Sequence, residues 1–396
     1  DGIDNDCDGG TDAEDFPGVG TPLAEELCET QAGVCAGATK PVGLCVEGAW
    51  LACSTALYAL NSADYEPDEL SCDGLDNDCD EATDEILWEK KLGGDSTDLL
   101  LNVAAVPSGG FLFVGATASP SLGAQSMDGW LIRTDDSGAE LWNKVYGGTS
   151  DDQLYDVANS PDGGFVVVGT NQSGVDGTKG TWVLKLASDG TIEWNKNFGS
   201  TTDDLAQGVV AVKAGGYAIV GRKDFVAGPR VEDARLLLLD EQGGVIADRT
   251  WAGSGPQAFI DVAEVPTGGF IACGHAKGVS EFDALLVRTD ALGQELWSRS
   301  WGGSGDDIFY GVAALPDGGF LAAGYSRSET PYGQDDLWLV RVDAAGDKLW
   351  EQFHGTSGRD QARGLALMPD GGFATAGFSP LGTGWVLRTD PLGNKV

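Results

Sequence analysis

Residues 161–194 of the chain read "PDGGFVVVGTNQSGVDGTKGTWVLKLASDGTIEW". The stretch contains a Pro-Asp-Gly-Gly turn, two apolar runs separated by a polar loop, and a second turn that leads to a final Trp. Proline suits the second position of such a turn, and glycine supplies the positive φ that the turn needs. The apolar positions do not recur with a helical period. The stretch therefore predicts short β-strands joined by tight turns.

The same pattern occurs six times from residue 86 onward. The turn ends in an aromatic residue each time, and a Trp precedes a Gly-rich pair in five of the six copies. The aromatic positions are Phe111, Phe165, Tyr217, Phe270, Phe320 and Phe373, and the Trp positions are Trp88, Trp142, Trp194, Ala247, Trp297 and Trp350. Each unit of about 52 residues holds four strand-like runs, which is typical of a propeller blade. The sequence predicts an all-β fold with a six-bladed β-propeller of four-stranded blades over 86–396.

The two ends of the repeat region predict how the ring closes. The last repeat stops at Val396, before its fourth strand, whereas Ile86–Leu92 reads as a fourth strand with no blade before it. We expect residues 86–92 to complete the sixth blade beside the C-terminal residues. Such closure would leave no large open strand edge.

Charge and hydropathy exclude two classes of partner. The chain carries 62 Asp and Glu against 24 Lys and Arg, a net charge of −38. Nucleic acid is therefore excluded, because phosphate binding needs a basic surface. No apolar run reaches the ~18 residues that a membrane helix needs, so no transmembrane segment is predicted. Residues 1–85 hold 22 of the acidic side chains but a single base, Lys40, which separates a small acidic module (1–85) from the propeller.

The cysteines also gather in this module. Seven of the eight lie in the first 79 residues, and Cys273 stands alone in the propeller region. A short, loop-rich segment dense in cysteine predicts disulfides and an oxidising compartment, and thus a secreted or cell-surface protein. Zinc is disfavoured because the module has no CxxC pair and no histidine. The disulfide candidates are Cys28, Cys35, Cys45, Cys53, Cys72 and Cys79.

Two acidic strings within the module resemble each other, "DGIDNDCDGGTDAED" at 1–15 and "DGLDNDCDEATDE" at 73–85. Alternate carboxylates in a tightly turning chain converge on one point, where they repel one another unless a hard divalent cation binds them. We therefore predict two calcium sites, although Glu81 and Leu87 depart from the loop pattern in the second. The alternative is a solvated acidic linker. The candidate ligands are Asp4, Asp6, Asp8, Asp12 and Asp15 in the first string, and Asp76, Asp78, Asp80 and Asp84 in the second.

Both parts resemble known bacterial sequences. The strings resemble the MopE-type metal-binding motif, CDGxDNDCDGxxDE, of large secreted proteins, over some fifteen residues each. That resemblance implies Cys72 as the partner of Cys79, and it leaves Cys7 without one, which predicts a longer polypeptide upstream. The copper attributed to one member is not implied, because residues 1–85 contain no His or Met. Residues 86–396 resemble β-propeller repeat proteins of the DGGF…DxWLxRxDxxGxxxW type, which implies a fold but no reaction.

Each blade also carries an acid or amide just after the Gly-rich pair. Six such groups would form a ring at one mouth of the central channel, able to hold a cation or a basic side chain. The alternative is that each caps its own turn through local hydrogen bonds. These residues are Asp98, Asp152, Asp204, Gln257, Asp307 and Asp360.

The motifs predict a structural rather than a catalytic role. The sequence contains no GxSxG, P-loop or HExxH motif, and neither His275 nor His354 lies beside an evident nucleophile. We therefore expect a protein that is not an enzyme, which binds calcium and serves assembly or adhesion, with self-association into a filament as one form. The alternative is a module that recognises a glycan or another surface protein through its propeller loops.

Overall fold

The computed structural model describes residues 27–41, 44–46, 49–66, 76–79, 90–172, 180–199, 203–225, 232–253, 255–379 and 383–396. The chain divides into two compact units, Asp1–Lys90 and Lys91–Val396.

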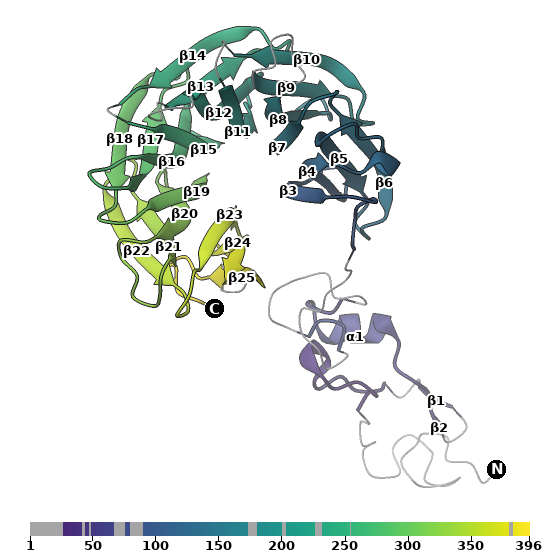
Figure 1. Cartoon of the computed structure of the whole chain (residues 1–396). Helices are drawn as coiled ribbons and strands as arrows, with labels where there is room; N and C mark the ends of the chain where they lie inside the picture. The colour runs from purple at the N-terminus through teal and green to yellow at the C-terminus, as the bar shows by residue number, and fades with distance from the viewer. Residues whose placement is uncertain are drawn as a thin grey trace, which may run out of the picture. The chain divides into compact units, whose positions relative to one another are not determined.

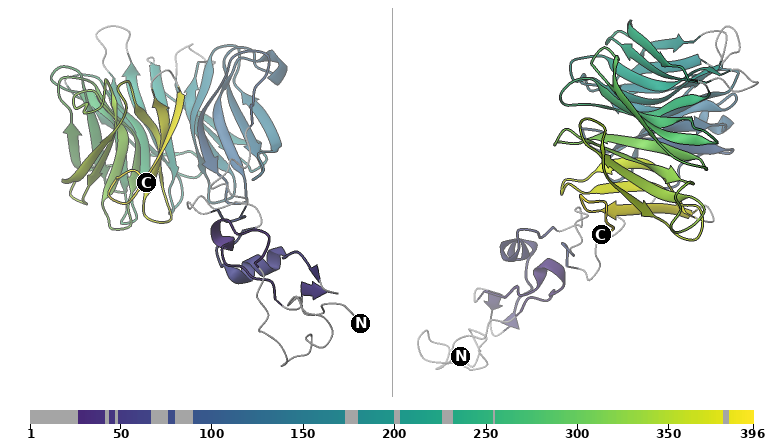
Figure 2. Two further views of the ribbon diagram at one scale, coloured as in Figure 1. Left: turned by 90° about the horizontal axis from the view of Figure 1, so that it is seen from below. Right: turned by 90° about the vertical axis from the view of Figure 1, so that its left-hand side faces the viewer.

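The second unit is a β-propeller of six blades, each an antiparallel sheet whose strands follow in chain order from the axis outward (Figures 1 and 2). The first three blades are β3 (Asp98–Ala105), β4 (Phe111–Thr117), β5 (Asp128–Thr134) and β6 (Glu140–Tyr146); β7 (Asp152–Asn159), β8 (Phe165–Asn171), β9 (Gly180–Leu186) and β10 (Ile192–Phe198); and β11 (Asp203–Ala211), β12 (Tyr217–Phe225), β13 (Asp233–Leu239) and β14 (Val245–Trp251). The last three are β15 (Gln257–Glu264), β16 (Phe270–Lys277), β17 (Phe282–Thr289) and β18 (Glu295–Trp301); β19 (Asp307–Ala314), β20 (Phe320–Ser326), β21 (Asp336–Val342) and β22 (Lys348–His354); and β23 (Gln361–Leu367), β24 (Phe373–Ser379) and β25 (Thr383–Thr389). The predicted fold class is confirmed.

The sixth blade shows three strands within the described residues. Past β25 the chain turns back, Lys395 bridges to Thr389, and the Val396 amide donates to the Arg388 carbonyl over 3.2 Å. The chain thus ends where a fourth strand would begin. Of the expected closing strand, residues 86–89 lie outside the described part, and Lys90–Leu92 form no strand. Closure by residues 86–92 stays a prediction.

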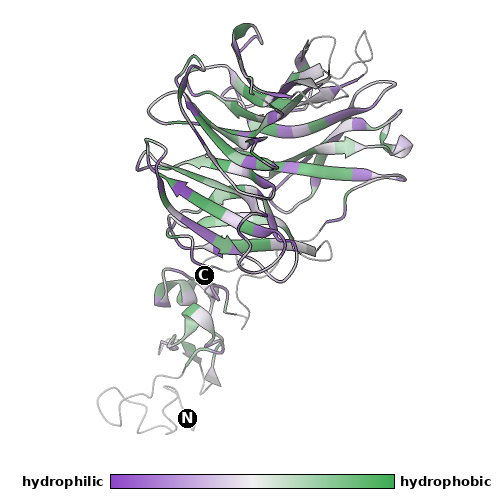
Figure 3. Cartoon of the chain, turned by 60° about the vertical axis from the view of Figure 1, so that its left-hand side comes forward, coloured by the Kyte–Doolittle hydropathy of each residue, from purple (hydrophilic) through white to green (hydrophobic). Residues whose placement is uncertain are grey.

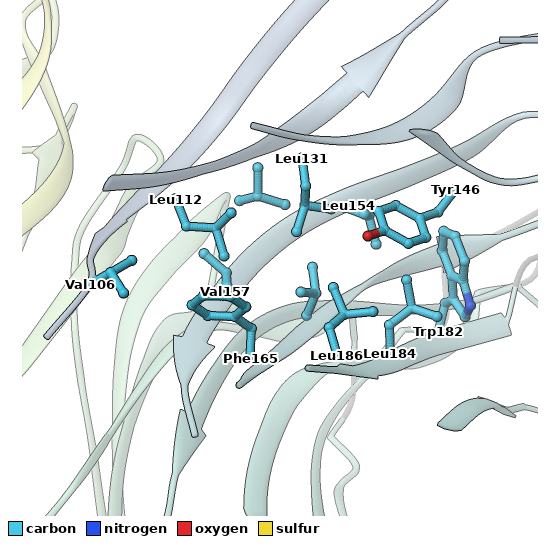
Figure 4. Close-up of a cluster of buried hydrophobic side chains, with 12 residues drawn as sticks. Val106, Leu112, Leu131, Tyr146, Leu154, Val157, Phe165, Trp182, Leu184 and Leu186 are labelled. Carbon is cyan, nitrogen blue, oxygen red and sulfur yellow. The ribbon is translucent and has the colours of Figure 1, made fainter. Parts of the chain in front are cut away.

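The core of the propeller lies between blades, where apolar side chains of neighbouring sheets interdigitate. Between the first two blades, Leu112 and Leu131 face Phe165 and Leu184 (Figure 4). The repeated Trp packs at the outer end of this layer, where Trp142 meets Phe165 edge-on with ring centroids 6.4 Å apart. Apolar residues line the strands of every blade (Figure 3), so one packing surface recurs around the axis.

The repeat also explains the base in the third strand of several blades. In the second blade, the Lys185 ammonium lies 2.7 Å from a carboxylate oxygen of Asp162, in the turn between β7 and β8. Arg388 and Asp370 repeat this ion pair in the sixth blade at 3.0 Å. The base therefore ties the third strand to the turn of its own blade.

The two end blades leave this packing surface uncovered. On β3, Leu100 is 41% exposed and Val103 is 50% exposed, whereas their counterparts in the second blade, Leu154 and Val157, are buried. On β25, Val386 is 72% exposed. Its counterparts in the five other blades, Leu131, Val183, Leu236, Leu286 and Leu339, are all buried. Figure 1 shows the first and sixth blades at the two ends of the arc of blades.

The first unit is small and held by disulfides. Its described elements are the 3-10 turn η2 (Gly33–Cys35), the strands β1 (Cys45–Val46) and β2 (Ala49–Trp50), and the helix α1 (Thr55–Asn61). Disulfides join Cys28 to Cys53 and Cys35 to Cys79, around a cluster that also buries Ala38 and Tyr58. Disulfide bonding in this segment is confirmed. The implied pairing of Cys79 with Cys72 is wrong, because Cys79 bonds to Cys35. Cys35 comes close because the neighbouring Val34 N–H donates to the carbonyl of Asp76, in the second acidic string.

We predict that the layer between blades carries the stability of the propeller. Replacing the buried Leu184 by Ala should lower the free energy of unfolding by about 2–5 kcal/mol, because the cavity left behind cannot close. Leu349, which is 59% exposed on β22, is the matched control. Urea unfolding of both variants measures the difference, and an equal loss for L349A would contradict this account of the core.

Candidate functional site: the axial cavity

The innermost strands of all six blades line a cavity of about 840 Å³ around the propeller axis. Its wall combines a buried and a half-buried carboxylate, aromatic rings and one arginine, whereas the layers between blades are mostly apolar. The residues that line it are Leu100–Val103 of β3, Tyr155 and Asp156 of β7, Gln207 of β11, Ile260 and Asp261 of β15, Tyr310 and Gly311 of β19, Arg363–Leu365 of β23, and 376–378 of β24.

Asp156 links three consecutive blades at the cavity wall. Its Oδ1 accepts from the Asn102 amide of the first blade at 2.6 Å, and its Oδ2 accepts from the Val209 main-chain N–H of the third blade at 2.7 Å. Asp261 repeats the forward link, because its Oδ2 accepts from the Val312 N–H of the next blade at 2.9 Å. Each carboxylate therefore joins one inner strand to its neighbour.

Glycine lets each receiving strand lie close to the blade that follows it. Gly208 and Gly311 occupy the position in the receiving blade that corresponds to the aspartate. A Cβ on Gly208 would lie 2.8 Å from the Ile260 carbonyl oxygen, and one on Gly311 would lie 2.9 Å from the Leu365 Cβ. Larger residues at either position would push the inner strands apart.

Burial makes both carboxylates weak acids. Removal from water, together with the nearby Asp261, raises the pKa of Asp156 to about 8, while the hydrogen bonds from Val209 and Val157 oppose the shift. Burial likewise raises the pKa of Asp261 to about 6. The cavity wall thus holds two groups that change charge near neutral pH.

On the other side of the cavity, Arg363 lies among aromatic rings. Its guanidinium is 3.9 Å from the centroid of the Tyr310 ring and 5.2 Å from that of Phe378, and its Nη2 donates to Gln361 Oε1 at 2.9 Å. The arginine side chain is nevertheless exposed. Cation, phenol and carboxylate around one apolar space are the groups that bind a polar ligand.

The repeated acids that were expected at the channel mouth do not line this cavity. Asp98 accepts from the Gly94 amide at 2.7 Å and from the Ser119 hydroxyl, and Asp360 accepts from the main-chain N–H and hydroxyl of Thr356. Asp307 similarly binds the Gly303 amide and the Ser326 and Ser328 hydroxyls. Asp152 and Asp204 are buried, and Gln257 is half-buried. These hydrogen bonds are local, as the alternative predicts in which each acid caps its own turn.

Most of the expected calcium ligands lie outside the described residues, namely Asp4, Asp6, Asp8, Asp12 and Asp15 of the first string and Asp80 and Asp84 of the second, as does Cys72. Asp76 and Asp78 are described. Asp76 is buried, and its carbonyl oxygen accepts from the Val34 N–H at 3.1 Å. Among the described residues, no group of three or more His, Cys, Asp or Glu side chains is arranged to hold a metal ion.

The sequence did not single out Asp156, Asp261, Tyr310 or Arg363. A signal was present, because the position four residues after each repeated acid or amide holds only Asn, Asp or Gly, namely Asn102, Asp156, Gly208, Asp261, Gly311 and Gly364. Only the bulge in each inner strand, which turns that position toward the next blade, gives this restriction its meaning.

No protein family model matches the chain, and no curated protein matches it. Similarity is found to solved structures, at low identity. The Pan2 WD40 domain of Neurospora crassa is 9% identical, with a TM-score of 0.45, over 74% of this chain and 79% of that one. A puromycin hydrolase mutant is 14% identical with a TM-score of 0.48, over 75% and 45% of the two chains. A glucose dehydrogenase is 12% identical with a TM-score of 0.45, over 72% and 95%.

These matches correct one expectation. The fold and the motifs led to the prediction that the chain is not an enzyme. That prediction is wrong, because two of the matched chains are a hydrolase and a dehydrogenase. Their low similarity assigns no reaction to this chain, so they do not establish whether it is an enzyme. Within the described residues, no helix is long and apolar enough to cross a membrane.

We predict that Asp156 makes the stability of the propeller depend on pH. Its folded pKa of about 8 lies above the unfolded value of about 4, so ionisation opposes folding, and stability falls as pH rises from about 4 through about 8. Urea unfolding at about pH 5 and about pH 9 should show a smaller fall for D156N than for the wild type. D343N removes a half-buried turn carboxylate and should keep the wild-type pH dependence. An equal fall in stability between the two pH values for D156N and the wild type would contradict the assignment to Asp156.

Proposed function

We propose that the chain is an extracellular structural protein whose propeller assembles with further copies of itself through its two end blades. The fold fits a structural or binding role, and the two disulfides are compatible with secretion. The observation that carries the proposal is the exposure of Leu100, Val103 and Val386 at positions that are buried in the interior blades.

The exposed face of the first blade and that of the sixth blade are complementary, because they repeat the two sides of the layer between blades. Within the chain, the face of each blade that carries the Val386 position packs on the face of the next blade that carries the Leu100 position. The sixth blade of one copy therefore presents the surface that the first blade of another copy is built to receive. This contact between copies takes the place of the closure within one chain that the sequence predicts. Such a contact joins different surfaces, so it is heterologous and propagates as a filament unless it closes into a ring.

The first unit would supply calcium-dependent order to such an assembly. Its acidic strings match the alternation of oxygen ligands in calcium loops. A module of this size has little core of its own, so two disulfides and bound calcium would together hold it folded.

A second role is supported by the axial cavity. Its exposed Arg363, the Tyr155 and Tyr310 rings and the Asp156 carboxylate form a site for a polar ligand such as a glycan. Loss of glycan binding on mutation of Arg363 to Ala, with assembly unchanged, would separate this role from self-association.

Assembly through the end blades predicts complementation between two variants. L100D and V386D should each be monomeric, because a charge on either face blocks one half of the contact, yet their mixture should form dimers through the two intact faces. Sedimentation velocity in calcium-containing buffer measures the species. L349D alters an exposed leucine on an outer strand and should assemble like the wild type. A wild-type protein that stays monomeric at high concentration would overturn the proposal.

Calcium removal should affect the two units differently. Chelation should expose residues 1–90 to protease, because the clustered carboxylates then repel one another, while residues 91–396 stay intact because their core is apolar. Mass spectrometry of the fragments distinguishes the units. Equal resistance of both units in chelator would count against calcium in the first unit.

A further inference from the structure

Some junctions between successive blades contain a pair of carboxylates that the proposed assembly does not use. At the first junction, Asp128 begins β5 and Asp152 begins β7, and the main chain joins them through the Asp152 N–H and the Met127 carbonyl at 2.6 Å. At the fifth junction, Asp336 begins β21, and the Asp360 N–H donates to the Asp335 carbonyl at 2.7 Å. All four aspartates of these two pairs are buried.

A glycine leaves space between the two carboxylates of each pair. A Cβ on Gly147 would collide with Asp128 Oδ1 and lie 2.9 Å from Asp152 Oδ2. A Cβ on Gly355 would lie 2.6 Å from Asp336 Oδ1 and 3.4 Å from Asp360 Oδ2. The carboxylates therefore converge on the small volume that the missing side chain leaves open.

At each site, one oxygen that points into this space lacks a hydrogen-bond partner, although at the fifth junction Asp360 Oδ2 accepts from Thr356. Asp128 Oδ1 and Asp336 Oδ1 accept no hydrogen bond although their residues are buried. Their sister atoms are satisfied, since Asp128 Oδ2 accepts from the Gln125 N–H and Asp336 Oδ2 accepts from the Tyr332 N–H, each at 2.8 Å. A buried, unpaired carboxylate oxygen is costly unless a cation or proton meets it.

At the second junction, an arginine side chain supplies positive charge near the buried carboxylate. Gly180 replaces the first aspartate there, and Arg235 reaches Asp204 with 3.7 Å between Nη1 and Oδ2. The same Nη1 also donates to the Thr181 hydroxyl and the Phe198 carbonyl. The guanidinium also forms two hydrogen bonds of 2.9 Å with Asp248, so Asp204 and Asp248 share its charge.

The third junction removes the space and one charge together. Ala252 stands where the first junction has Gly147, so a methyl group occupies the open volume, and Gln257 stands where it has Asp152. The second junction keeps the glycine, Gly199, without the pair, whereas the third lacks both. The fourth junction keeps the glycine and the pair, but Lys277 lies near Asp283 and partly offsets its charge.

We propose that the first and fifth junctions each bind one hard divalent cation such as calcium, between Asp128 and Asp152 and between Asp336 and Asp360. Two carboxylates match the charge of one divalent ion, and all the available side-chain ligands are oxygens. Main-chain carbonyls and water complete the coordination, as in other calcium sites. The positive charges of Arg327 and Arg359 are directed to Asp335 instead.

The test counts calcium bound to the full chain by equilibrium dialysis and elemental mass spectrometry. G147A/D152Q gives the first junction the two residues of the third and should bind one calcium fewer than the wild type, and circular dichroism checks that alanine at a φ of +157° leaves the propeller folded. D336N/D360N should also bind one fewer, and combining all four changes should remove two. Ions held by the first unit are common to all variants and do not affect these differences.

The matched controls are G364A, whose added Cβ meets no atom within 4 Å, and D343N/D390N, which removes two turn carboxylates. Both should bind as many ions as the wild type. An unchanged count in G147A/D152Q and D336N/D360N would overturn the proposal and assign each pair a shared proton. Crystals of the wild type soaked in terbium give a second readout, and the absence of an anomalous peak between Asp336 and Asp360 would also overturn it.

Discussion

The packing of one blade against the next is the interaction on which the rest of the structure depends. Leu112 and Leu131 on one sheet meet Phe165 and Leu184 on the following sheet, and every junction along the array repeats this apolar layer. The blades are single sheets with two apolar faces, so none can bury its surface alone. This repeated contact also fixes the positions of the polar groups at the axial cavity and of the junction carboxylates.

An open array of this kind has consequences that a closed ring lacks. The first and last blades carry the residues of the layer without a partner, as the exposure of Val386 beside its buried counterparts shows. The same repetition that builds the interior therefore supplies two complementary surfaces for assembly. At the inner edge, Asp156 and Asp261 hold adjacent strands together, and at the outer edge the repeated Trp does so.

The sequence predicts the propeller well because its signals are local and recur. The Pro-Asp-Gly-Gly turn needs a positive φ, which Gly163 adopts at +85°, and the alternation of apolar residues defines the strands. The pairing of Cys35 with Cys79 could not be read in the same way, because it depends on how distant loops pack. The cavity residues and the junction pairs such as Asp336 and Asp360 were hidden for a similar reason. They are far apart in the sequence and converge only across a blade junction.

Hydroxyl-radical footprinting of Leu100, Val103 and Val386 over a range of protein concentrations tests most directly whether the end blades carry uncovered copies of the interior surface. Leu154 and Val157, buried at the first junction, serve as internal references. The account predicts strong oxidation of the end-blade residues at low concentration and protection as the concentration rises, with no change in the references. Protection equal to that of Leu154 at every concentration would contradict it, because the first and sixth blades would then already be joined within one chain.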